Sequence, residues 1–386
     1  MVTTGQLLLL SAIFGLFSLP QNANAFDRAE ASSAMMLATG DRTILWERAG
    51  PGGGGWITVA RWDPVKKARL HVGSDVGGYY VSDDEGQTFT IRNQGLTHLY
   101  VQDIAVHRRE ENRILLATRG GLFSTEDAGE HWVARRNGFP RVAEYSLSAP
   151  IGTLAVGRAN PDLVFAGVGT RRDKTLYQGG LYKSLDFGLS WRRLTRTPFS
   201  GAEIYDIELH PDTDENLLVA TNTGLFISED GGATFASTEL GNVLVGDVAF
   251  VRLQEGVVAF ALSTRRPVDA EKSGRVAVDR VWRSHDPKKT WVKIPDEGLP
   301  RDAMEGHSQA SARHASTLSR IAVGDFGSNR ILVGDESWVS GGVYVFDEAE
   351  ASWALATRKK NGIDGPANME YGWLTKWKPT AITIDT

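Results

Sequence analysis

Ser82-Asp83-Asp84-Glu85-Gly86-Gln87-Thr88-Phe89 decides the fold, because its pattern returns along the chain. The shared form is Ser/Thr-x-Asp-x-Gly-x-Ser/Thr/His-aromatic, and the later copies place aspartates at Asp127, Asp186, Asp230 and Asp286. The copy at 284–291 has lost its glycine. Successive aspartates are 43, 59, 44 and 56 residues apart. Four-stranded propeller blades repeat every roughly 40 to 50 residues, so the spacing fits blades with insertions.

Short β-rich runs separated by turn signals fill the intervals between these copies. In the first unit the runs cover 57–60, 70–73, 78–82 and 88–92, and the repeated turn lies between the third and fourth runs. Five further units follow, and the fifth unit of the chain carries a polar insertion at 265–275. Blades of this kind bury their faces only against their neighbours, so the ring must close. We therefore expect an all-β fold, a seven-bladed β-propeller of four-stranded blades.

The end of the chain bears on how the ring closes. Residues 379–385 match the first strand of a blade, but no second, third or fourth strand follows. Either this strand closes the ring with the N-terminal segment around Leu45, or the chain is a fragment of a longer protein. The propeller is expected over residues 44–386, after a polar N-terminal segment at 26–43.

Residues 1–25 differ in composition from the rest of the chain. An apolar run from Leu7 to Leu19 is followed by Pro20 and by the small-x-small sequence Ala23-Asn24-Ala25. This order predicts a signal peptide, removed on export, and hence a secreted or periplasmic protein without membrane attachment after cleavage. The alternatives are an uncleaved anchor or a buried helix.

Composition excludes several kinds of chemistry. The 386 residues contain no cysteine, so neither disulfides nor cysteine-zinc sites can form. The formal net charge is -5 and no long basic run occurs, which argues against a nucleic-acid partner. Motifs of serine hydrolases, zinc proteases and phosphate-binding loops are absent, and no cofactor is expected. His307 and His314 flank a serine-rich stretch, which is typical of a polar loop rather than a metal site.

The repeated turn is the Asp-box, or BNR repeat, and it resembles turns of sialidases, sortilin-type receptors, photosystem assembly factors and certain endoglucanases. An aspartate can accept N–H bonds across its own turn, and glycine supplies a position with φ > 0. The aromatic residue packs between sheets. We therefore expect a structural role for Asp84, Asp127, Asp186, Asp230 and Asp286.

One connection departs from the repeat. Residues 73–80 read Gly-Ser-Asp-Val-Gly-Gly-Tyr-Tyr, whereas the equivalent connections at 118–121 and 221–224 are shorter and lack the carboxylate at this point. Together with Gly52–Gly55 and Trp56, this stretch resembles the start of the family 74 glycoside hydrolases, which are xyloglucan-cleaving endoglucanases. The resemblance covers about residues 45–90 and is supported by Gly372-Trp373 and the terminal strand.

The resemblance implies a role for Asp75. It places Asp75 at the position of the general base, which activates water in an inverting mechanism. Such a mechanism needs a second carboxylic acid roughly 6.5 to 9.5 Å away. In the family that acid lies in a second propeller, so by resemblance it is not present in this chain, and a second propeller domain is a possible partner. The alternative for Asp75 is a carboxylate that caps a tight Gly-Gly turn.

A polysaccharide substrate would also need aromatic rings, because sugar faces present C–H groups that pack on them. The candidates near blade edges are Tyr79, Tyr80, Trp338, Trp373 and Trp377, and core packing is the alternative for each. A sialidase is less favoured, because no Arg-Ile-Pro segment occurs. The leading hypothesis is a secreted glycoside hydrolase acting on xyloglucan or related β-glucans. The alternative is a non-catalytic Asp-box propeller that binds glycan or protein.

Overall fold

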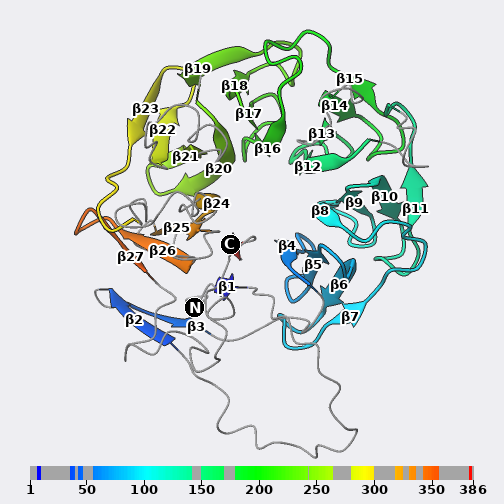
Figure 1. The fold of residues 1–386 in the computed structure, drawn as a ribbon, viewed down its shortest axis with the longest axis horizontal. Coiled ribbons are helices and arrows are strands. Elements are labelled where there is room, and N and C mark those ends of the chain that lie inside the picture. The colour runs from blue at the N-terminus through cyan, green and yellow to red at the C-terminus, as the bar shows by residue number, and fades with distance from the viewer. Residues whose placement is uncertain are drawn as a thin grey trace, which may run out of the picture.

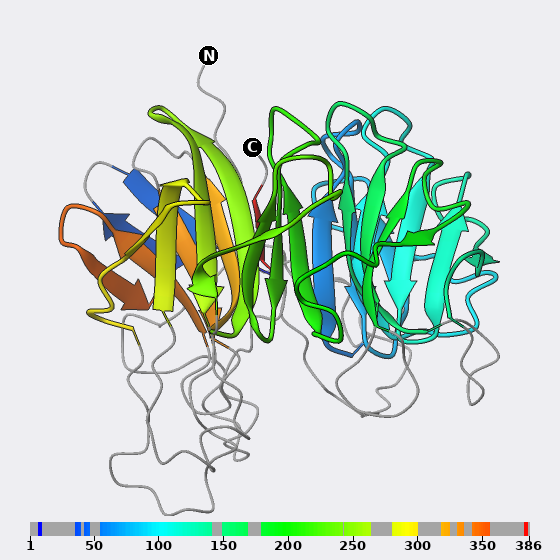
Figure 2. The same ribbon diagram turned by 90° about the horizontal axis from the view of Figure 1, so that it is seen from above.

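A computed structural model describes residues 55–140, 149–168, 179–241, 243–263, 280–299, 318–324, 330–335 and 342–355, and the backbone of 7–9, 35–39, 42–46 and 382–384. Every secondary-structure element in these residues is a β-strand, and the strands form a ring of sheets (Figure 1). Figure 2 shows the ring from the side, with strands running between its two faces. The prediction of an all-β propeller with four-stranded blades is confirmed.

Each blade is an antiparallel sheet whose strands follow chain order from the centre to the outside (Figure 1). Blades one to three comprise β4 (Ile57–Trp62), β5 (Leu70–Ser74), β6 (Tyr79–Ser82) and β7 (Thr90–Ile91); β8 (Val101–Val106), β9 (Ile114–Thr118), β10 (Gly121–Thr125) and β11 (Val133–Arg135); β12 (Ile151–Val156), β13 (Val164–Val168), β14 (Gly180–Ser184) and β15 (Arg192–Arg193).

Blades four to six repeat this order. They comprise β16 (Ile204–Leu209), β17 (Leu217–Thr221), β18 (Gly224–Ser228) and β19 (Ala236–Gly241); β20 (Val245–Leu253), β21 (Gly256–Ser263), β22 (Arg280–Asp286) and β23 (Thr290–Lys293); β24 (Leu318–Gly324), β25 (Arg330–Asp335), β26 (Gly342–Asp347) and β27 (Ser352–Leu355).

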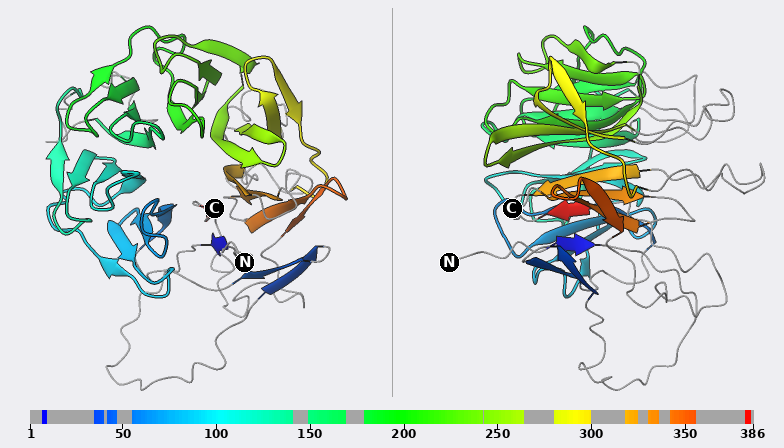
Figure 3. Two further views of the ribbon diagram at one scale, coloured as in Figure 1. Left: turned by 180° about the vertical axis from the view of Figure 1, so that it is seen from behind. Right: turned by 90° about the vertical axis from the view of Figure 1, so that its left-hand side faces the viewer.

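The described residues form six four-stranded blades, so the prediction of seven is wrong. The terminal strand β28 (Ile382–Ile384) brings no further strands of its own; it pairs antiparallel with β1 (Leu7–Leu9). The pair stands between blades six and one, with β28 against β24 and β4 (Figures 1 and 3). The expected partner around Leu45 is also wrong, because Leu45 pairs with Met36 between β3 (Arg42–Trp46) and β2 (Met35–Thr39).

The core lies between neighbouring blades. In blades one to four the second and third strands are buried on both faces, as in β9 and β10, where all five residues of each strand are buried. Side chains of adjacent blades meet there, for example Leu115 and Leu122 of blade two with Ile151 and Val164 of blade three. Such strands carry continuous apolar runs rather than a strict alternation. The outer strands β7 and β11 are exposed or half-buried, so blades are stabilised mainly by their neighbours.

The repeated turns are closed by their own side chains. Asp84 Oδ1 accepts the N–H of Thr88 at 2.8 Å and the hydroxyl of Ser82 at 2.7 Å, while Ser82 Oγ accepts the N–H of Gly86 at 2.8 Å. Gly86 has φ +86°, as the turn requires. The same bonds recur around Asp127, Asp186 and Asp230.

The fifth turn has a different closure. Asp286 pairs with Lys289 Nζ at 2.8 Å, and Ser284 Oγ donates to the carbonyl of Thr290 at 2.5 Å. Because strands alternate in direction, the repeated turns lie at one face of the ring, and the connections between second and third strands lie at the other. We call the second face the Asp75 face, since Asp75 lies between β5 and β6.

Candidate functional site

Asp75 is anchored to the start of the innermost strand of blade one. Its Oδ1 accepts the N–H of Trp56 at 2.8 Å, and its own N–H donates to the carbonyl of Trp56 at 3.0 Å. A Cβ on Gly55, which has φ +93°, would come within 2.3 Å of Oδ1. The half-buried carboxylate therefore caps the chain entering β4, and Oδ2 accepts no hydrogen bond from the residues that the structure describes.

Asn93, in the connection from blade one to blade two, holds the Asp75 loop from beside it. Its Oδ1 accepts the N–H of Tyr79 at 2.8 Å, and its Nδ2 donates to the carbonyl of Gly77 at 2.7 Å. Ser74 Oγ accepts the N–H of Gly77 at 2.7 Å. Gly78 has φ +81°, and a Cβ there would lie 2.4 Å from Asn93 Oδ1. Glycine is therefore needed at this position, and the loop has a fixed shape.

A buried hydrogen-bond network lies beneath the loop. His71 of β5 places Nε2 3.0 Å from Asp63 Oδ2 and Nδ1 2.6 Å from the hydroxyl of Tyr79 in β6. Neither the His71 nor the Asp63 side chain is exposed. Asp63 Oδ1 also accepts the N–H groups of Val65 and Lys66 at 2.7 and 2.8 Å. The network joins the two strands that flank Asp75.

The charges of this network follow from burial. Burial lowers the pKa of His71, against the opposing effect of Asp63. Burial acts to raise the pKa of Asp63, but its hydrogen bonds to His71, Lys66 and Val65 outweigh this and lower the pKa. A neutral imidazole with its proton on Nε2 donates to the Asp63 carboxylate and accepts from Tyr79. All three groups are then satisfied, as buried polar groups require.

The structure places the two predicted tyrosines in the core. Tyr79 has 0% exposure, and its ring packs edge-on against Trp132 of blade two at 5.1 Å between centroids. Tyr80 is 4% exposed and packs with the buried residues of blade one. Neither ring offers a surface to a sugar. Trp338, Trp373 and Trp377 lie outside the described residues, as do His307 and His314.

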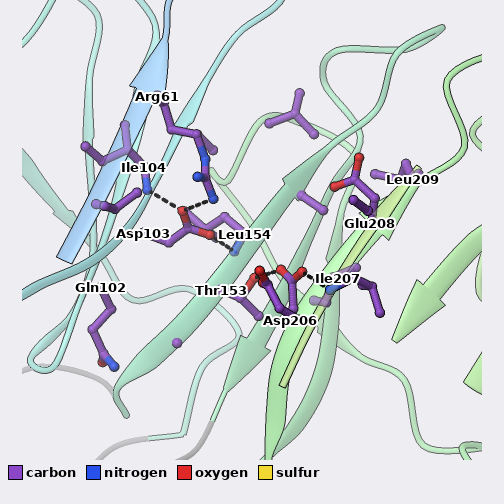
Figure 4. A pocket seen from close by; sticks show the side chains of 18 of the residues that line it. Arg61, Gln102, Asp103, Ile104, Thr153, Leu154, Asp206, Ile207, Glu208 and Leu209 are labelled. Atoms are coloured by element: carbon purple, nitrogen blue, oxygen red, sulfur yellow. Dashed lines mark hydrogen bonds and ion pairs between the residues drawn. The ribbon is translucent and has the colours of Figure 1, made fainter. Parts of the chain in front are cut away.

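The centre of the ring encloses a polar cavity of about 300 Å³ (Figure 4). Each innermost strand contains a register shift between its first and third residues, and the third residue is aspartate in blades two, four and five, namely Asp103, Asp206 and Asp247. These carboxylates accept N–H bonds from the innermost strand of a neighbouring blade: Asp103 from Leu154 at 2.8 Å, Asp206 from Val248 at 3.1 Å and Asp247 from Ile321 at 2.7 Å. They therefore clamp adjacent blades together.

Charge in the cavity is only partly balanced. Arg61 Nη2 lies 2.9 Å from Asp103 Oδ1 (Figure 4). Burial raises the pKa of Asp206 and of Asp247, and a neighbouring aspartate adds to the shift of each. Burial, followed by the charge of Asp206, raises the pKa of Glu208 to about 7. Glu208 has Arg158 Nη2 at 3.9 Å from Oε1 as its ion-pair partner.

The cavity and the Asp75 loop are separate features. Asp75 is not among the residues that line the cavity, whereas Glu208 is. Glu208, whose pKa lies near neutrality, and Asp75 therefore do not share a cavity.

Among the described residues, no group of three or more histidine, aspartate or glutamate side chains is arranged to hold a metal ion, and no helix is long and apolar enough to cross a membrane.

The sequence analysis did not identify the three aspartates that clamp adjacent blades (Asp103, Asp206 and Asp247), the buried network or Asn93. A sequence pattern does mark the clamp, because aspartate followed by isoleucine or valine opens three units, at 103–104, 206–207 and 247–248. The network had none, since Asp63, His71 and Tyr79 form no motif along the chain. Only the pairing of β5 with β6 brings His71 and Tyr79 together.

The chain is similar in sequence to a known xyloglucanase. No family model matches. The xyloglucanase Xgh74A of Acetivibrio thermocellus is 23% identical over 175 residues, which make up 40% of this chain and 19% of that protein. The chain thus matches about a fifth of the length of this curated relative.

Solved structures share the fold. The GH74 xyloglucanase of Xanthomonas campestris superposes with a TM-score of 0.60 at 16% identity, covering 87% of this chain and 53% of that one. An ancestral GH74 enzyme gives 0.58 at 19% identity, covering 80% and 39%. The GH74 enzyme of Niastella koreensis gives 0.56 at 18% identity, covering 87% and 53%. The resemblance of this chain to the family 74 glycoside hydrolases, over the extent of one propeller, is therefore confirmed.

Proposed function

We propose that this propeller is the substrate-binding and base-carrying part of a glycoside hydrolase acting on xyloglucan or a related β-1,4-glucan. Asp75 is the general base. Support comes from the matched xyloglucanase and from the exceptional blade-one connection that carries Asp75. One observation carries the proposal: the Asp75 loop is rigidly held, while Oδ2 of its carboxylate accepts no hydrogen bond from the described residues. A positioned carboxylate oxygen can take a proton from attacking water.

The acid that protonates the leaving oxygen is expected from a second propeller outside this sequence. An inverting mechanism needs two carboxyl groups with space for water between them. The matched region makes up only 19% of the xyloglucanase. Glu208 has the raised pKa that such an acid needs, but it belongs to the central cavity and not to the Asp75 loop. The complete reaction is therefore assigned to a two-propeller protein.

A non-catalytic glycan-binding propeller is the second candidate. The observation that favours it is the capping bond from the N–H of Trp56 to Asp75 Oδ1, which is a structural use of the carboxylate. The two candidates differ in the behaviour of Asp75→Asn. An enzyme loses hydrolysis of xyloglucan and keeps glucan binding, whereas a binding module shows no hydrolysis in either form.

We further propose export of the protein, on the strength of the apolar run and the small-x-small sequence in residues 1–25. Cleavage there would remove β1, the partner of β28. N-terminal sequencing of the protein from medium and periplasm tests this. A mature terminus near residue 26 supports export with cleavage, and an intact terminus recovered only from the cytoplasm contradicts it.

A further inference from the structure

Arg119, on the turn between β9 and β10, stacks on the ring of Tyr100 and has no acidic partner among the residues that the structure describes. The guanidinium carbon of Arg119 lies 3.6 Å from the centroid of the Tyr100 ring, and the backbone N–H of Arg119 donates to the backbone carbonyl of Tyr100 at 3.1 Å. The residue is exposed. In the part of the chain that the structure describes, no carboxylate lies within 4.0 Å of the guanidinium nitrogens. Stacking on an aromatic face orders an arginine while leaving its N–H donors available.

This stack lies beside the Asp75 loop. Tyr100 immediately precedes β8, as Trp56 immediately precedes β4, and the two strands are joined by the bond from Thr58 Oγ1 to the carbonyl of Val101 at 2.7 Å. Gly73, two residues before Asp75, packs so closely on Val101 that a Cβ would come within 2.4 Å of its side chain. The Arg119 turn and the Asp75 loop are thus equivalent connections of adjacent blades, on the same face.

Apolar side chains are exposed around the same place. Trp56 is 38% exposed, Val76 is 58% exposed and Leu99 is 39% exposed. Val76 follows Asp75 directly, and a Cβ on Gly55 would touch both residues, which places Val76 against the chain entering β4. Exposed apolar groups gathered at one place on a surface mark binding sites. We call Trp56, Val76, Leu99, Tyr100 and Arg119 the Asp75 rim.

We propose that the Asp75 rim is a sugar subsite in which Arg119, ordered on Tyr100, donates hydrogen bonds to hydroxyl groups of a neutral β-linked glucan while Trp56 packs on a pyranose face. This rests on the proposed function, which places a glucan at Asp75. The combination of an apolar aromatic surface and planar donors fits a sugar, which has C–H faces and equatorial hydroxyls.

Binding of xyloglucan oligosaccharides and of cellohexaose, measured by calorimetry, tests the subsite. Arg119→Ala should weaken binding about tenfold, the effect of losing hydrogen bonds to a charged donor. Tyr100→Ala should weaken it similarly by releasing the arginine, whereas Tyr100→Phe, which keeps the ring, should bind like the wild type. Arg192→Ala is the matched control, because Arg192 is also exposed but lies on β15 of blade three.

The outcomes separate the subsite from the catalytic proposal. If Arg119→Ala binds as tightly as the wild type, or no more weakly than Arg192→Ala, the subsite assignment is wrong. Tighter binding of glucuronate-containing oligosaccharides than of neutral ones also overturns it, because the ligand class would then be acidic. Absence of hydrolysis together with Arg119-dependent binding removes the base role of Asp75 and leaves the subsite standing. Hydrolysis that depends on Asp75 but not on Arg119 supports the base role of Asp75 and overturns the subsite.

Discussion

The Nδ1 atom of His71 lies 2.6 Å from the hydroxyl oxygen of Tyr79, with no part of Tyr79 or His71 exposed to solvent. The bond joins β5 to β6 on either side of the loop that carries Asp75. Tyr79 also reaches blade two, where a Cβ on Gly129 would come within 2.8 Å of its ring. One buried side chain therefore links the candidate base loop, the blade core and the next blade.

Tyr79→Phe should destabilise the protein by about 1–3 kcal/mol, because His71 Nδ1 is left buried without a donor. Urea unfolding measures this change in the free energy of unfolding. Tyr100→Phe is the matched control, since Tyr100 is partly exposed and no bond of its hydroxyl to a described residue is found. Equal stability of Tyr79→Phe and wild type would show that the network is not a structural element.

Asp103→Ala should destabilise the ring more than an average substitution. The carboxylate accepts the N–H groups of Ile104 and Leu154 and pairs with Arg61, and it is 4% exposed. Leaving these partners unsatisfied should cost about 2–4 kcal/mol. Gln102→Ala on the same strand is the control, because Gln102 Oε1 has no hydrogen-bond partner among the residues that the structure describes. Similar unfolding midpoints for the two variants would exclude the clamp.

The repeated turns should differ in importance. Asp127→Ala removes the bonds that close a complete turn, a loss comparable to that of a helix cap, about 1 kcal/mol. Asp286→Ala removes an exposed pairing with Lys289 from a copy that has lost its glycine, so its effect should be smaller. Thermal unfolding compares the two. A larger loss for Asp286→Ala would contradict the fastening role of the complete turns.

Stability should fall as the pH rises through about 7. The folded-state pKa of Glu208 is raised to about 7 by burial and by Asp206, above its ordinary value of 4.5. The folded protein therefore binds this proton more tightly than the unfolded chain, and the resulting stabilisation is complete below about 4.5 and lost through 7. Unfolding measured from pH 5 to 8 should show this slope, and Glu208→Gln should reduce it. An unchanged slope in Glu208→Gln would show that titration of other groups causes the pH dependence of stability.

The sequence predicted the features that depend on residues close together in the chain, namely the repeated turns and the four-stranded blades. Asp84 and Ser82 close their turn within eight residues, so the motif was visible, and its recurrence at intervals of 43 to 59 residues indicated four-stranded blades with insertions. The number of blades was not predictable, because residues 379–385 match the first strand of a blade, whereas in the structure β28 belongs to a two-stranded sheet with β1 rather than to a four-stranded blade. For Tyr79 the sequence leaves two interpretations open, a sugar-binding ring or a core ring, and the structure places the ring in the core. Its burial depends on His71 and on blade two, which only the folded sheet brings to it.

Hydrolysis of xyloglucan by wild type and Asp75→Asn, each made from the full coding sequence that contains this chain, tests the central claim most directly. The isosteric amide keeps an oxygen for the N–H of Trp56, so melting temperature and oligosaccharide binding should stay close to wild type. The account predicts hydrolysis by the wild type and a loss of at least about a hundredfold in Asp75→Asn, the effect of removing a general base. Equal hydrolysis by the two proteins, or none by the wild type, would contradict it.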